Sequence, residues 1–290
     1  MLIRYGYELT LNCQQPTFML CMLDAHRERA HHIRYETPVI TTPQIDSSTY
    51  IDLYGNHVRR LIAPAGDLAI CCDAVIDDSG LPDPVVLDAQ EVVMEQIPSN
   101  YLVYLLGSRY CETDKLGDIA WQLFGSTPRG WHRVQAICDF VCDHLTFGYE
   151  YARATRTAYE AFEERKGVCR DFAHLAVTFC RCMNIPARYT NGFLGDIGVP
   201  SNPTPMDYNA WFEVYLDGGW FTFDARHNTP RIGRIPVARG RDAIDVAMVT
   251  SFGPHSLTRF RVWTEEINEG VLQDLIAASL ESEALAFHRN

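Results

Sequence analysis

The protein has 290 residues, 47% of them apolar, and a formal net charge of −12 from 25 basic and 37 acidic residues. This composition supports a large buried core in one large or two smaller domains, and it excludes an intrinsically disordered chain. The acidic balance argues against a general nucleic-acid or anionic-membrane binder, because phosphate contacts need a positive surface. The longest uninterrupted apolar stretch, residues 18–23, is far too short to cross a membrane. We therefore expect neither nucleic acid nor a membrane as a partner.

The first eleven residues alternate apolar and polar positions, which predicts a β-strand and not a secretory signal. The ten cysteines include no CxxC pair and show no zinc-type Cys/His spacing. We expect reduced, mostly buried thiols in a cytoplasmic protein that uses neither a metal nor another cofactor.

Short runs with a period of two residues cover the first third of the chain. They lie at residues 3–11, 48–64, 68–76 and 84–94, and Pro, Gly and Asp separate them. This spacing indicates an all-β domain resembling a sandwich or barrel, which we place at residues 1–97.

Helical periodicity begins beyond a boundary region that we place between Pro98 and Leu116. Residues 129–145 carry one apolar stripe at spacings of three and four, formed by Val134, Ile137, Cys138, Val141 and Leu145. Residues 158–167 predict a shorter helix that ends at Gly167. Residues 170–185 predict a third helix, because an apolar face repeats along it and Pro186 stops it.

Strands return after Pro186. We predict them at residues 187–195, 209–216 and 220–225. The last two are joined by an Asp-Gly-Gly sequence, which is a strong hairpin signal, and we place the turn on Gly218 and Gly219.

A further strand at residues 255–266 and a helix at residues 270–285 end the pattern. The chain therefore predicts an α+β fold, in which an all-β domain precedes helices packed on an antiparallel sheet. We assign residues 98–290 to this second part, including the C-terminal strand and helix.

Cys169 stands at the first turn of the third predicted helix, in the segment ERKGVCRDFAHLA. Unpaired N–H groups and the helix dipole favour a thiolate there, and the same groups can stabilise an oxyanion. The alternative is a small hydrophobe packed under a loop. Cys180 and Cys182 lie deep in the same helix, and we interpret both as packing residues.

The order of Cys169, a helix and a hairpin ending in FTFDARHN resembles the transglutaminase-like superfamily of papain-type cysteine enzymes. It is most similar to the bacterial transglutaminase-like cysteine proteases, which carry an N-terminal β-region. The similar segments are residues 108–114, 167–189, 206–234 and 240–253. The resemblance implies a papain/transglutaminase-like core with a Cys nucleophile, a His on the next strand and an Asp on the strand after it. By position these residues are Cys169, Asn209 and Asp224, so an asparagine stands where the family has histidine.

Asn209 changes the expected chemistry, because a carboxamide does not titrate and cannot protonate a leaving amine. His227 is the nearest substitute, since a turn on Gly218-Gly219 would set it opposite Ala210, beside Asn209. We favour instead a role for His227 in anchoring the loop after its strand, and we expect Asp224 to point toward residue 209. On the third helix, we interpret His174 as a packing or surface residue and Asp171 as a first-turn acid.

Two functions remain open. The first is hydrolysis or acyl transfer of peptide or side-chain amides through a Cys169 thioester, impaired by Asn209. The second is a catalytically inactive protein that binds a peptide or protein in the same cleft. Both imply a peptide or protein partner.

Overall fold

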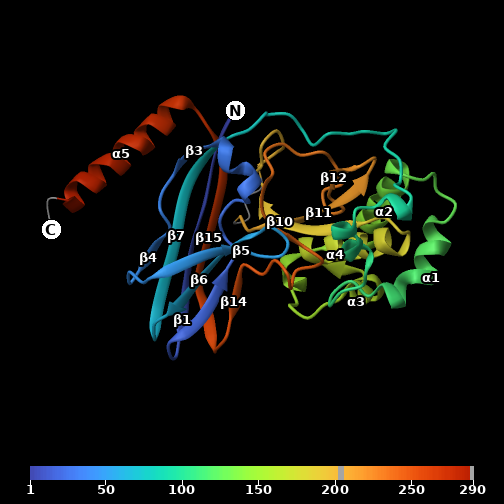
Figure 1. Ribbon diagram of the computed structural model, residues 1–290, viewed down its shortest axis with the longest axis horizontal. Coiled ribbons are helices and arrows are strands. Elements are labelled where there is room, and N and C mark those ends of the chain that lie inside the picture. The colour runs from blue at the N-terminus through green and yellow to red at the C-terminus, as the bar shows by residue number, and fades with distance from the viewer. Residues whose placement is uncertain (202–205, 288–290) are drawn as a thin grey trace.

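A computed structural model describes residues 1–201 and 206–287. Figure 1 shows two lobes side by side, one built of β-sheet and one containing most of the helices. We call the part formed by β1–β7, β14 and β15 the β lobe, and the part formed by α1–α4 and β8–β13 the core lobe. The observed fold is mixed α+β, as the sequence predicts.

The β lobe is a pair of packed antiparallel sheets. The first has the order β15-β1-β7-β3, with β4 also pairing with β7, and the second has the order β14-β2-β6-β5. The strands of the first sheet are β1 (Leu2–Cys13), β3 (Ile33–Glu36), β4 (Ile40–Thr42), β7 (Gly66–Asp77) and β15 (His255–Ile267). Those of the second are β2 (Thr17–Cys21), β5 (Ser47–Ile51), β6 (His57–Ala63) and β14 (Val249–Ser251). Alternate side chains of both sheets meet in one buried cluster, as the period of two predicts.

The C-terminal strand β15 belongs to the β lobe. It pairs with β1 along its whole length, from Leu2 opposite Ile267 to Cys13 opposite His255. Our sequence analysis placed this strand with residues 98–290, so its position differs from the expectation. The physical reason is that both edges of β1 carry backbone N–H and C=O groups that need hydrogen-bond partners. Strand β7 supplies partners for one edge only, and β15 supplies them for the other. The boundary at residue 97 remains a prediction.

The core lobe packs helices on a four-stranded antiparallel sheet. The helices are α1 (Thr113–Phe124), α2 (Trp131–His144), α3 (Ala158–Glu164) and α4 (Cys169–Cys182). The sheet has the order β12 (Gly219–Phe223), β11 (Asn209–Leu216), β10 (Ala187–Phe193) and β13 (Ile235–Gly240). Helix α4 is buried among the other three helices and the sheet, which explains its apolar composition.

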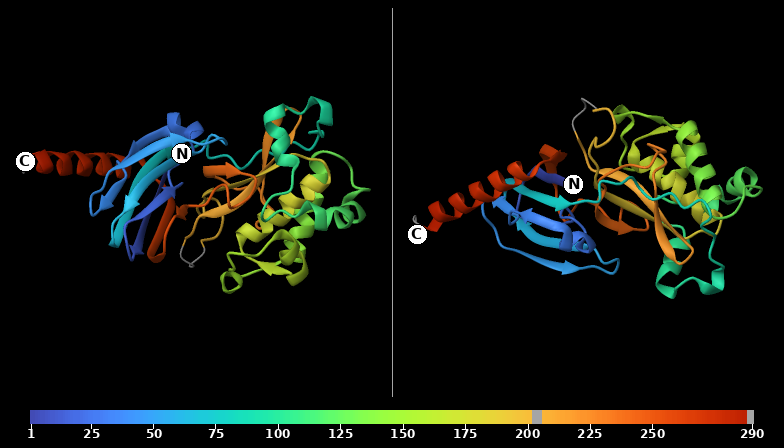
Figure 2. Two further views of the ribbon diagram at one scale, coloured as in Figure 1. Left: turned by 60° about the horizontal axis from the view of Figure 1, so that its bottom comes forward. Right: turned by 90° about the horizontal axis from the view of Figure 1, so that it is seen from above.

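The remaining elements are short, apart from the last helix. Strands β8 (Thr146–Phe147) and β9 (Lys166–Gly167) pair in parallel, and 3₁₀ turns cover Arg27–His32, Met94–Gln96, Ser99–Leu105 and Tyr149–Tyr151. Helix α5 (Glu269–Phe287) extends away from both lobes (Figure 2) and contacts the β lobe near its start, where Leu272 meets Leu2 and Val75. Within residues 1–201 and 206–287, no helix has the length and apolar content that crossing a membrane requires.

Most predicted elements are confirmed, and all five residues of the α2 stripe are buried. The predicted strand at residues 84–94 is wrong, because this segment runs over the core lobe and makes one isolated bridge, between Glu91 and Leu216. The second predicted helix ends before Gly167, since Arg165 adopts a left-handed conformation with φ of 53°.

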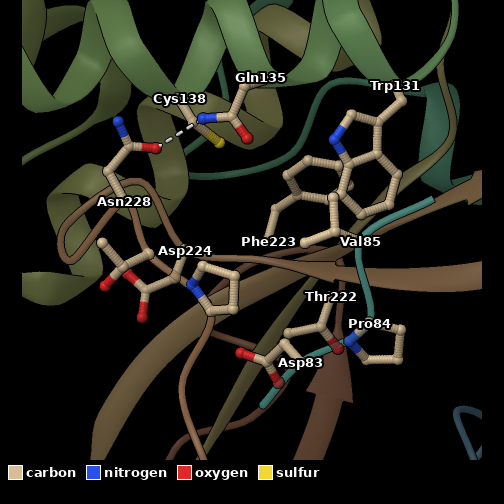
Figure 3. A pocket seen from close by; sticks show the side chains of 12 residues that line it. Asp83, Pro84, Val85, Trp131, Gln135, Cys138, Thr222, Phe223, Asp224 and Asn228 are labelled. Atoms are coloured by element: carbon tan, nitrogen blue, oxygen red, sulfur yellow. Dashed lines mark hydrogen bonds between the residues drawn. The ribbon is translucent and has the colours of Figure 1, made fainter. Parts of the chain in front are cut away.

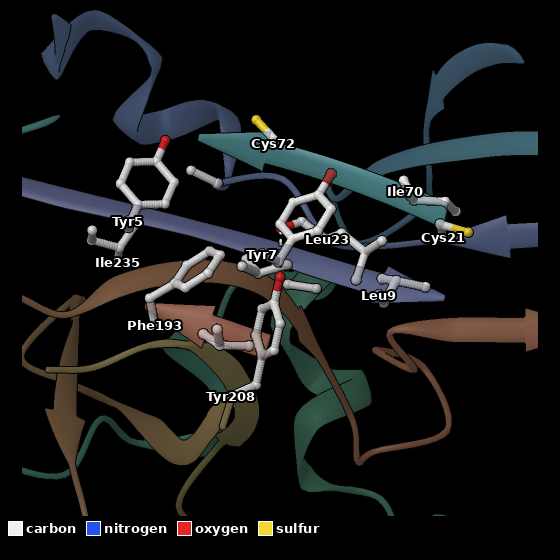
Figure 4. Packing of buried hydrophobic residues seen from close by; sticks show 14 of the residues in the cluster. Tyr5, Tyr7, Leu9, Cys21, Leu23, Ile70, Cys72, Phe193, Tyr208 and Ile235 are labelled. Carbon is white, nitrogen blue, oxygen red and sulfur yellow. Dashed lines mark hydrogen bonds between the residues drawn. The ribbon is translucent and has the colours of Figure 1, made fainter. Parts of the chain in front are cut away.

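An aromatic contact joins the two lobes (Figure 4). Tyr5 of β1 packs on Phe193 of β10 with ring centroids 5.0 Å apart, and Phe193 packs on Tyr208 at 4.7 Å. The Tyr208 hydroxyl donates to the Leu23 carbonyl at 2.9 Å. Burial of these rings and satisfaction of the hydroxyl hold the lobes in one arrangement.

Candidate active site

The start of α4 is fixed by Asp171. Its carboxylate accepts the Val168 backbone N–H at 2.9 Å and pairs with Arg156 at 3.0 Å. This satisfies one of the free N–H groups at the helix start, so Asp171 is a first-turn acid as predicted. The side chain of Cys169, the next residue after Val168, is thereby held at the first turn of the helix.

Cys169 is half-buried and lines a cavity of about 790 Å³ between the lobes. Burial raises the pKa of its thiol to about 11, and the carboxylates of Asp207 and Asp224 add to this, whereas the Arg226 charge and an Ala210 backbone N–H act in the opposite direction. The thiol is therefore neutral near pH 7. The helix start therefore does not by itself make this thiol a thiolate, because burial disfavours the charged form.

Asn209 begins β11 and lines the same cavity. Its side-chain N–H₂ group lies 3.4 Å from the carbonyl oxygens of Leu194 and Asp207, and its Oδ1 accepts from Arg226 at 3.2 Å. The structure thus brings Cys169 and Asn209 to one site. The amide is held by three neighbours in an orientation set by the protein.

Asp224 is buried, and its carboxylate bonds to groups other than the side chain of Asn209. Its Oδ2 lies 2.8 Å from His227 Nδ1 and 2.9 Å from Arg234 Nη2, and its Oδ1 accepts two backbone N–H groups of the same loop. Burial opposes ionisation, but the Arg234 charge and the His227 hydrogen bond hold the pKa of Asp224 well below its usual range. The expected contact between Asp224 and residue 209 is replaced by these stronger, charge-assisted bonds. Figure 3 shows Asp224 beside a smaller cavity of about 90 Å³, on the side of the sheet that faces Trp131.

The hairpin register explains where His227 lies. The turn uses Asp217 and Gly218, both with positive φ, and Leu216 pairs with Gly219. Our placement of the turn on Gly218-Gly219 is therefore wrong. If the observed register is continued beyond the end of β12, Arg226 and not His227 lies opposite Asn209. His227 anchors its loop through Asp224, as predicted, and is not among the described residues that line the Cys169 cavity.

Two residues of this site, Arg226 and Asp207, were not predicted from the sequence. The Arg226 guanidinium lies 3.8 Å from the centre of the Phe147 ring and reaches Asn209 Oδ1. Asp207 lines the cavity, and burial raises the pKa of its carboxyl group. Each lies two positions from a predicted site residue, Asp207 from Asn209 and Arg226 from Asp224. This closeness in the segments MDYNAW and FDARHN was the sequence signal that could have identified them.

His174 serves packing, as predicted. Its buried ring stacks on Tyr110, with centroids 5.0 Å apart, and its Nε2 accepts the Ala243 N–H at 3.1 Å. In the part of the chain that the structure describes, no three His, Cys, Asp or Glu side chains gather as a metal ion would require.

Residues 119–225 match the transglutaminase-like superfamily, and this range includes Cys169, Asn209 and Asp224. The chain contains a transglutaminase-like domain. A crystal structure titled "Putative Cysteine Protease" from Cytophaga hutchinsonii is 28% identical, with a TM-score of 0.79 over 92% of this chain and 91% of that chain. An uncharacterized protein of Mycobacterium leprae is 27% identical in a 229-residue alignment that covers 72% of this chain and 77% of the relative. The similarity to the crystal structure thus extends beyond the transglutaminase-like domain into the β lobe.

The raised pKa of Cys169 predicts how its alkylation depends on pH. We expect the rate of alkylation by iodoacetamide, followed by peptide mass spectrometry, to rise about tenfold per pH unit between pH 7 and 10, because only the thiolate reacts. Replacing Arg226 with Gln should slow alkylation at every pH in this range, since it removes a positive charge that lowers the pKa of the thiol. A rate that levels off near neutral pH would show a stabilised thiolate and contradict this assignment.

Proposed function

We propose that the protein is a transglutaminase-like cysteine enzyme that takes an acyl group onto Cys169. The sulfur attacks a carbonyl carbon, the bond to the leaving group breaks, and the leaving group departs with the proton that the thiol gave up. Water or an amine then attacks the thioester and restores the thiol. The observation that carries the proposal is Cys169 itself, placed at the start of a buried helix and opening onto a large cavity.

The surrounding groups suit part of this chemistry. The Ala210 N–H and the first turn of α4 offer donors to the developing negative charge, and the Arg226 guanidinium adds a positive one. What position 209 lacks is a group that gives a proton to a leaving amine. A missing acid–base residue lowers rates by a factor of about 10²–10⁴. We therefore infer slow turnover on ordinary amides and faster reaction where the leaving group needs no proton.

A second candidate is a binding protein without turnover. The neutral thiol and the fixed orientation of Asn209 favour it. In both cases we infer that the partner is a peptide or protein.

Acylation by p-nitrophenyl acetate separates the two candidates, because p-nitrophenolate leaves without a proton. We expect one acetyl group on Cys169, found by peptide mass spectrometry, and none at that position in Cys169→Ala. The adduct should decay when water or an added amine is present. If no acetyl group reaches Cys169 while the thiol can still be alkylated at high pH, the enzyme assignment is wrong and the binding candidate replaces it.

A further inference from the structure

We propose that the cavity beside Cys169 is a specificity pocket for the acyl part of the substrate, and that it selects a bulky apolar side chain of leucine or phenylalanine size. The inference rests on the proposed function and names its substrate class. A transferred or cleaved acyl group would then carry an apolar residue at the reacting carbonyl, and not a glutamine or a charged residue.

The β lobe supplies much of the apolar lining of the cavity. The core lobe contributes Cys169, Asn209 and Ala210, and the β lobe and its connections contribute Leu9, Leu11, Leu23, Met248, Leu257 and Phe260. Leu9, Leu11 and Leu23 are almost fully buried, so they form a fixed surface. A cavity of about 790 Å³ lined mainly by apolar groups, with fewer polar groups, has the size and character of a ligand pocket.

Several of the polar side chains around the cavity are already engaged within the protein. Asn191 bonds the backbone of Val246 and Ala238, and Tyr110 donates to the Ala154 carbonyl. Arg153 pairs with Glu160 and Glu164, and the guanidinium of Arg170 pairs with Asp171 and reaches backbone carbonyls. A carboxamide entering here would find few partners for its own hydrogen bonds, which makes glutamine a poor occupant.

The rim of the cavity exposes apolar side chains that a substrate would cover. Leu257, on β15, is 53% exposed, and Ile244, after β13, is 49% exposed. Leu257 belongs to the β lobe and Ile244 to the core lobe, so both lobes present an exposed apolar side chain to the cavity. Because both side chains are largely exposed, a polar replacement at either site leaves the folded core intact.

A series of p-nitrophenyl esters of N-acetylated Phe, Leu, Ala and Gln tests the pocket. The leaving group is the same throughout and needs no proton, so the rates of Cys169 acylation compare the acyl parts alone. After division by each ester's rate with hydroxide, we expect the Phe and Leu esters to react at least about tenfold faster than the Ala and Gln esters, in line with the discrimination of apolar pockets.

Two variants locate the effect. Leu257→Asp should reduce the preference for Phe and Leu over Gln severalfold. Leu53→Asp replaces a leucine that is 85% exposed and does not line the cavity, and it should leave the preference unchanged. Acylation with equal corrected rates across the series, or a preference that survives in a Leu257→Asp, Ile244→Asp double variant, would overturn the pocket while leaving the proposed function standing. Failure of every ester to acylate Cys169 would overturn both.

Discussion

Replacing Asn209 with histidine should raise the rate of amide cleavage by about 10²-fold, the lower end of the contribution of a general acid–base group. Position 209 lines the cavity with Cys169, so an imidazole there can both take the thiol proton and return it to the leaving amine. The Arg226 charge beside it disfavours the protonated ring, which is why we expect the lower end of the range. The measurement is the cleavage of an N-acetyl-phenylalanine p-nitroanilide, with the matching p-nitrophenyl ester for comparison. The anilide should gain more than the ester, because only the amine needs a proton.

Asn209→Ala and His227→Ala serve as controls. Asn209→Ala removes the amide without adding a base and should give no gain. His227→Ala should act mainly on stability, since the ring holds Asp224 and its loop. The assignment would be refuted if the unchanged protein cleaves the anilide rapidly and a His227→Ala variant, folded and of unchanged stability, does not. The base would then be His227.

Replacing Glu213 with alanine should lower the free energy of unfolding by about 3–5 kcal/mol, the usual cost of removing one partner of a buried ion pair. Glu213 is buried on β11 and accepts hydrogen bonds from Arg239 at 2.8 and 3.0 Å and from Arg188 at 2.5 Å. Without it, two guanidinium groups remain in the interior with their main counter-charge gone. Urea unfolding followed by tryptophan fluorescence measures the loss.

Glu28→Ala is the matched control for Glu213. Glu28 also pairs with Arg239, but its side chain is 45% exposed, so its loss should cost less than about 1 kcal/mol. If both variants lose the same stability, the buried pair is not the dominant contact.

The same cluster gives a pH dependence of stability. Burial opposes the charge on Glu213, but Arg239 and Arg188 lower its pKa in the folded protein. The unfolded chain therefore binds more protons at acidic pH, and the stabilisation that is present above about pH 4.3 is lost as the pH falls toward the folded-state pKa. Glu213→Ala should flatten this acid limb of the stability curve.

The elements that the sequence predicted are those whose side chains repeat with a clear period. The α2 stripe and the alternation of β1 are examples, and both are buried as expected. The strand predicted at residues 84–94 failed because a short apolar run says nothing about whether a partner strand lies alongside. Helix α1 was not predicted although Leu116, Ala120 and Phe124 repeat every four residues, because three apolar positions are a weak signal and Gly117 lowers the helix propensity of the segment.

The sequence was enough to predict which main residues form the candidate site, but it did not predict the contacts that these residues make. The sequence located Cys169 at a helix start, and the structure confirms that position. It did not predict that burial would raise the pKa of the Cys169 thiol. It also did not predict the hairpin register in which Arg226 bonds to Asn209 and His227 bonds to Asp224. Desolvation depends on residues far away in the chain, which local patterns do not contain. The register is set locally by the turn on Asp217 and Gly218, and the sequence offered two overlapping turn pairs, Asp217-Gly218 and Gly218-Gly219.

The pairing of β1 with β15 has a consequence for the order of events on the ribosome. Strand β1 leaves the ribosome long before residues 255–267, which cover its second edge. The β lobe therefore cannot close until those residues have also been synthesised. Such a distant pairing is also expected to form slowly and to leave an apolar edge exposed to other chains in the meantime. Leu257 and Phe260 lie on β15 and line the cavity. The cavity beside Cys169 is therefore complete only after β15 has paired with β1.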